Sequence, residues 1–147
     1  MTKLHYNITI NATAEKIWDV LWSDTNYPQW TSVFGPGSRA VTDWKKGSKA
    51  LFLGEGGEGL VSRIVEHKPN EYMLFEHLGE VKDGVEDTES PQARQWAGAL
   101  EDYTLVAGNG NCELTTTIDI ADDYVEWFKD VWPKAMEKIK TMSEDVL

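Results

Sequence analysis

The order of hydrophobic patterns along this chain restricts its fold more than any other feature. Residues 3–11 alternate apolar and polar side chains, as a half-buried strand does. Residues 14–22 then repeat apolar side chains at helical spacing, and a short turn containing Pro28 follows. The last helical pattern runs from about Asp122 to Glu144, and the roughly ninety residues between are strand-and-turn sequence. This order predicts an α+β fold in which a curved antiparallel sheet of about six or seven strands wraps round a long C-terminal helix, with two short helices after the first strand.

Turn signals divide the central region into strands. The expected strands are residues 38–44, 48–53, 60–67, 71–78, 96–107 and 111–120. The strongest turn signal is Asn109-Gly110, a dipeptide favoured in two-residue hairpins. Residues 80–95 are acidic and irregular, and we expect either a solvated loop or a lid over a cavity mouth anchored at Trp96. Pro133 lies inside the final helical pattern, where it should kink the helix or mark a joint.

Length and charge restrict the class of protein. The 147 residues fit one domain, so we treat 1–147 as a single unit. The formal net charge of −11 argues against a nucleic-acid-binding protein and opposes binding to an anionic membrane. The single cysteine, Cys112, cannot form an internal disulfide, and the sequence contains neither an apolar signal segment nor a membrane-spanning run. These features predict a cytoplasmic protein.

Local motifs support a family resemblance. Residues 14–21 (AEKIWDVL), 27–30 (YPQW), 44–47 (WKKG) and the strand–Pro–strand stretch 63–75 resemble motifs of the START-like superfamily, also called Bet v 1-like or SRPBCC. The resemblance covers nearly the whole chain and implies the helix-grip fold, although residues 80–97 form a longer connection than is usual in the family. Within the superfamily, the chain is most similar to proteins related to the C-terminal domain of the Hsp90 ATPase activator and to polyketide-cyclase-like proteins. The superfamily includes carriers, enzymes and co-chaperones, so the resemblance leaves the function open.

A curved sheet around a helix usually encloses a cavity, and aromatic residues are abundant, with seven Trp, five Tyr and four Phe. Alternation places Met73, Phe75 and His77 on one face of their strand. The neighbouring strands and the C-terminal helix present further side chains to the same space. The expected ligand-binding residues are Trp30, Phe34, Met73, Phe75, His77, Trp96, Tyr103, Leu114, Thr116, Trp132 and Met136. The alternative is a collapsed core made of the same side chains.

The best candidates for acid–base chemistry are His77 paired with Tyr103 or with Glu76, because histidine titrates near neutral pH. Glu76 and His77 are adjacent in a strand and should face opposite sides, which weakens that dyad. A histidine with satisfied hydrogen bonds in the core is the competing interpretation. The sequence therefore identifies no catalytic residue firmly.

Two further patterns favour structure over chemistry. His67, His77 and Cys112 lack the spacing of metal ligands, so we expect no metal and no other cofactor. Residues Gly54–Gly59 superficially resemble a phosphate-binding loop, but no helix follows and the two variable positions are glutamates, which repel phosphate. We expect a hairpin turn there.

Three functions stay open. The first is binding of a small hydrophobic or aromatic molecule in a cavity between the sheet and the C-terminal helix, without chemistry. The second is a cavity enzyme of the cyclase, hydratase or hydrolase type. The third is a co-chaperone-like protein-interaction module with a chaperone partner, which only the resemblance supports. The edge strands of such a sheet could also pair two copies into a homodimer.

Overall fold

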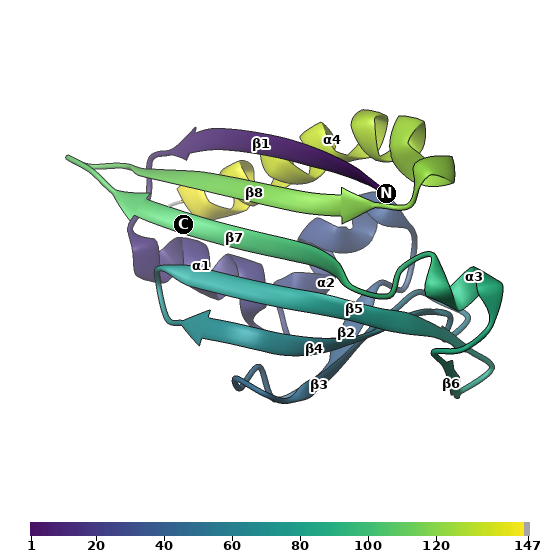
Figure 1. The fold of residues 1–147 in the computed structure, drawn as a ribbon. Helices are drawn as coiled ribbons and strands as arrows, with labels where there is room; N and C mark the ends of the chain where they lie inside the picture. Colours follow the sequence, from purple (N-terminus) through teal and green to yellow (C-terminus); the bar gives the residue numbers. More distant parts are fainter. Residues whose placement is uncertain (146–147) are drawn as a thin grey trace.

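One open antiparallel sheet curves round the helices (Figure 1). The computed structural model describes residues 1–145. The strands are β1 (Thr2–Ile10), β2 (Arg39–Val41), β3 (Lys49–Leu53), β4 (Gly59–Lys68), β5 (Tyr72–Lys82), β6 (Val85–Asp87), β7 (Ala99–Ala107) and β8 (Cys112–Ile120). The helices are α1 (Ala14–Trp22), α2 (Tyr27–Thr31), α3 (Pro91–Arg94) and α4 (Val125–Glu144), with 3-10 turns η1 (Ser32–Phe34) and η2 (Asp122–Tyr124). The strand order is β1-β8-β7-β5-β4-β3-β2, and β6 pairs with β5.

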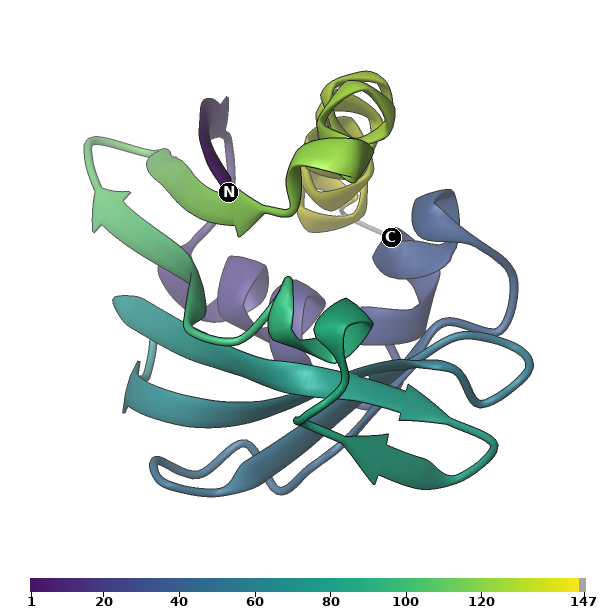
Figure 2. The same ribbon diagram turned by 45° about the vertical axis from the view of Figure 1, so that its right-hand side comes forward.

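The helices lie inside the curve of the sheet (Figure 2). Helix α4 packs along β1 and against α1 and α2, so the core lies between these helices and the inner face of the sheet. The predicted helix-grip architecture is confirmed. The sheet has eight strands because the acidic segment expected to be a loop forms a short hairpin, in which β6 pairs with the end of β5 across Asp83-Gly84. Within residues 1–145 no helix is long and apolar enough to cross a membrane.

Helices α1 and α4 form where capping and apolar spacing predict them. The Thr13 hydroxyl accepts a hydrogen bond from the Lys16 N–H and caps α1. The apolar stripe of α1 is buried, including Ile17 and Leu21. At the C-terminal pattern, the short lead-in is the turn η2, and α4 continues through Pro133.

Alternation sets the two faces of β5. Met73, Phe75 and His77 are buried on the inner face, as the sequence predicts. Glu76 points to the outer face, where its carboxylate forms an ion pair with Arg63 at 2.8 Å. At the hairpin between β7 and β8, Gly110 adopts a φ of 81°, a conformation that glycine accepts without steric cost.

A cluster of aromatic rings fills the middle of the space between sheet and helices. The Trp22 ring is 4.8 Å from Tyr103 and 5.3 Å from both Phe75 and Trp44, measured between ring centroids. At these separations the rings are packed against one another. The inner space is therefore occupied at its centre, and what remains hollow lies toward one end of the sheet.

Candidate functional site

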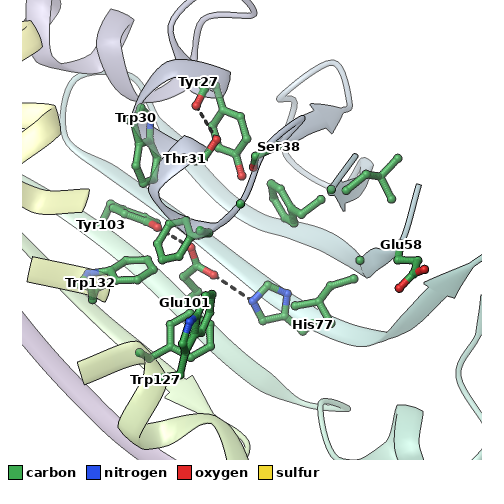
Figure 3. Close-up of a pocket in the computed structure, with 18 residues that line it drawn as sticks. Tyr27, Trp30, Thr31, Ser38, Glu58, His77, Glu101, Tyr103, Trp127 and Trp132 are labelled. Atoms are coloured by element: carbon green, nitrogen blue, oxygen red, sulfur yellow. Dashed lines mark hydrogen bonds and ion pairs between the residues drawn. The ribbon is translucent and has the colours of Figure 1, made fainter. Parts of the chain in front are cut away.

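A cavity of about 260 Å³ opens at the end of the sheet where α2, η1 and the β3–β4 turn meet the start of α4. Figure 3 shows it enclosed by side chains from these elements and from the inner face of β5 and β7. Eight aromatic side chains line it: Tyr27, Trp30, Phe34, Phe52, Tyr103, Trp127, Phe128 and Trp132. Its walls are thus mainly apolar, which is typical of a small-molecule site.

A chain of hydrogen bonds runs across three strands at the cavity wall. The Glu101 carboxylate on β7 accepts from His77 Nε2 on β5 at 3.0 Å, and its other oxygen accepts from the Tyr103 hydroxyl. His77 Nδ1 lies 2.6 Å from the Ser62 hydroxyl on β4, and Ser62 is fully buried. Because the Glu101 carboxylate can only accept, His77 Nε2 is the donor of that bond, and Nδ1 shares the second bond with the Ser62 hydroxyl. The four side chains therefore hold one another in fixed orientations.

The environment keeps the cavity phenols protonated. Burial, and next the Glu101 charge, raise the pKa of Tyr103 well above its ordinary value. The same two causes, in the same order, raise the pKa of Tyr27 well above its ordinary value. Both phenols therefore remain hydrogen-bond donors at neutral pH, and Glu101 is the charged group of the wall.

The structure brings five of the predicted ligand-binding residues together. Trp30, Phe34, His77, Tyr103 and Trp132 all line the cavity. The remaining buried candidates pack in the core away from it, namely Met73, Phe75, Leu114, Thr116 and Met136. Trp96 lines a neighbouring depression, where its ring centroid is 5.6 Å from that of Tyr124. None of residues 80–95 lines the cavity, so this segment is not placed as a lid in the structure.

The structure does not bring the candidates for acid–base chemistry into direct contact with one another. His77 and Tyr103 do not contact each other directly, because Glu101 lies between them. Glu76 is on the outer face and takes no part in the site. His67, the other histidine considered, accepts from Trp18 Nε1 at 3.0 Å and donates through Nδ1 to the Trp44 carbonyl at 2.7 Å, which is a structural role.

Sequence reasoning missed Glu101 and Ser62. Glu101 is two residues before Tyr103, so alternation places both on the same face of β7, and this signal was available. Ser62 required the pairing register of β4 with β5, which shifts between Val61 and Ser62. No pattern in the sequence announces that shift.

Neither a protein-family model nor a curated protein matches the sequence. Solved structures do match. The Aha1 dimer from Colwellia psychrerythraea is 19% identical, with a TM-score of 0.72 over 98% of this chain and 97% of that one. Protein MLL2253 from Mesorhizobium loti is 14% identical, with a TM-score of 0.73 over 96% of each chain. CalU16 from Micromonospora echinospora is 11% identical, with a TM-score of 0.65 over 95% of this chain and 74% of that one.

The chain has the α+β helix-grip fold, which these solved structures share. The neighbours include Aha1, the Hsp90 ATPase activator, so the predicted resemblance is confirmed at the level of the fold. At these identities, a shared fold does not transfer an activity, because function resides in the side chains of a site.

Proposed function

We propose that this START-like protein binds a small, mainly apolar molecule in the cavity between its sheet and α4. The observation that carries the proposal is the lining of eight aromatic side chains around one hydrogen-bonded polar centre. Ligand sites combine apolar walls with a few fixed polar groups, which orient the guest. The cavity is about 260 Å³, slightly below the roughly 300–1,000 Å³ usual for drug-sized ligands, so the guest has one or two rings.

An enzyme acting in the same cavity is the second candidate, because His77, Glu101 and Tyr103 form a proton-bearing network at its wall. The geometry supports binding better. Both His77 ring nitrogens and the Tyr103 hydroxyl already have partners within the protein. A general acid or base needs a polar atom free to reach the guest. Among the described lining groups, only the Glu101 carboxylate combines charge with spare hydrogen-bonding capacity in the wall.

The likeness to an Aha1 dimer also supports a homodimer as a proposal for this chain. Light scattering of the purified protein at several concentrations tests it. A mass that stays at one chain throughout the concentration series would contradict the dimer.

Binding is tested by NMR titration with one- and two-ring aromatic molecules. The indole N–H signals of Trp127 and Trp132 report on the cavity, and that of Trp18, which is bonded to His67, serves as a distant reference. We expect saturable shifts at the first two signals and much smaller shifts at the third. A native mass spectrum of protein taken directly from its own cells would show any cargo that remains bound.

A cavity-filling variant and a matched control variant test the same proposal. Leu60 lines the cavity, so Leu60→Trp should occupy its volume and weaken binding at least tenfold. Val106 is 61% exposed on β7 and does not line the cavity, so Val106→Trp adds the same side chain elsewhere and should leave binding unchanged. Equal binding by both variants, or no shifts with any molecule of the panel, would overturn the proposed function.

A further inference from the structure

Within the described chain, His77 is the only basic side chain that lines the cavity, and it is already hydrogen-bonded to Glu101. Two glutamates line the cavity, Glu101 in the wall and Glu58 at the exposed rim. No lysine or arginine is found among its lining residues within the described chain. An anionic guest would therefore meet negative charge without a compensating cation, whereas a cationic guest would meet an oppositely charged partner.

The Glu101 carboxylate has capacity left for such a guest. A carboxylate offers about four lone-pair positions, and His77 and Tyr103 occupy two of them. The Glu101 side chain remains 22% exposed, although it is surrounded by aromatic rings. Figure 3 shows its carboxylate between Tyr103 and His77, on the side where Trp127 and Trp132 also approach.

Phe34, Trp127 and Trp132 pack against one another in the cavity wall next to Glu101, so a cation would lie against the ring surfaces that they leave open to the cavity. The Phe34 centroid is 5.1 Å from that of Trp132 and 6.1 Å from that of Trp127. Tryptophan and phenylalanine faces attract ammonium groups through their ring quadrupoles, and cages of such rings bind quaternary ammonium ligands. The walls and the carboxylate thus favour the same charge on the guest.

We propose that the cavity selects an organic cation, an amine or quaternary ammonium group on a small apolar body, with Glu101 as its counter-ion and Phe34, Trp127 and Trp132 as its walls. This inference rests on the proposed function and deepens it by assigning the charge of the guest. The formal net charge of −11 acts in the same direction, because it raises the local concentration of cations around the protein at low salt.

The test compares three molecules of similar size: phenyltrimethylammonium, its neutral isostere tert-butylbenzene, and benzoate. Each is titrated into the full chain at low ionic strength and followed through the indole N–H signals of Trp127 and Trp132. We expect the cation to bind at least about tenfold more tightly than the isostere, and benzoate to bind more weakly than either.

Two variants and one control variant assign the preference for the cation to its sources. Glu101→Gln removes the charge at constant shape and should abolish the cation preference while leaving the isostere affinity within about twofold. Glu76→Gln removes the same charge from the outer face of β5 and should change neither affinity. Trp127 is 45% exposed, so Trp127→Leu should fold normally and should reduce the cation affinity about two- to fivefold more than that of the isostere.

The outcomes separate the inference from the proposed function. If the isostere binds in the cavity as tightly as the cation, and Glu101→Gln changes neither affinity, the inference is wrong and the proposed function stands. If Glu76→Gln has the same effect as Glu101→Gln, net charge alone explains the preference and the inference is wrong. If none of the three molecules shifts the cavity signals, both are overturned. Should Glu101→Gln fail to fold, the Trp127→Leu comparison decides alone.

Discussion

Removing the Tyr103 hydroxyl tests whether the polar centre of the cavity is a structural unit. In the variant Tyr103→Phe, the ring that packs 4.8 Å from Trp22 is kept, and only the donor to Glu101 is lost. Hydrogen bonds to charged groups contribute about 1.5–3 kcal/mol to stability. The Glu101 side chain is 22% exposed, so water replaces part of the lost interaction. We therefore expect the variant to lower the free energy of unfolding by about 1–2 kcal/mol.

The assay is urea denaturation at pH 7, followed by tryptophan fluorescence. The midpoint should fall without a change in the denaturant slope, because the surface exposed on unfolding is the same. In a thermal scan, the loss corresponds to about 2–8 °C for a chain of this length. Tyr72→Phe is the control, because Tyr72 begins β5 and does not line the cavity, and it should cost less than about 0.5 kcal/mol.

The reasoning is refuted if Tyr103→Phe costs no more than Tyr72→Phe. A double-mutant cycle with Glu101→Gln sharpens the test, since the stability effects of substitutions within one hydrogen-bond network do not add. Loss of the Tyr103 hydroxyl should cost less once the Glu101 charge is gone. Full additivity of the two changes would show that the hydroxyl and the carboxylate do not interact in solution.

Two further predictions concern the frame that holds the site. At Gly59, an added Cβ would collide with the Phe52 carbonyl oxygen, so Gly59→Ala should cost about 2–4 kcal/mol in urea denaturation, whereas Gly54→Ala, with ordinary contacts only, should cost under about 1 kcal/mol. The reverse order would contradict the strand contact. The Glu144 carboxylate accepts a hydrogen bond from the Asn11 N–H at 2.8 Å, and this bond lowers the pKa of Glu144 below its value in the unfolded chain. The stabilisation by Glu144 is therefore present above the unfolded pKa and is lost as the pH falls through the folded pKa. Glu144→Gln should lower the melting temperature at pH 7 but not at about pH 3, and a difference that persists unchanged in acid would disprove the link.

The fold was predictable because its signals are local and repeated. Alternation along residues 71–78 identified the inner face of β5, and Asn109-Gly110 identified the hairpin of β7 and β8. The exact end of β5 was not predictable. It extends to Lys82 and pairs with β6, although the acidic sequence there resembles a solvated loop.

The site was only partly predictable, because it depends on packing between distant segments. Periodicity placed Phe75 and His77 on one face, but it could not tell which of them lines a cavity. The position of Trp22 distinguishes the two residues. Its ring lies 5.3 Å from that of Phe75 and fills the centre of the fold, so the cavity lies toward His77. The sequence pattern identifies Trp22 merely as a flank of the α1 stripe, since ring positions follow from tertiary packing.

The position of the cavity at the end of the sheet has a kinetic consequence. Glu58 at the rim is exposed, and Trp127, which also lines the cavity, keeps 45% of its surface in water, so a molecule that enters retains contact with the solvent. Entry and departure then require only movements of loops and side chains, which take nanoseconds to microseconds, rather than separation of α4 from the sheet, which is a partial unfolding event. A cavity built in this way exchanges its contents quickly and tolerates a guest whose tail protrudes from the mouth.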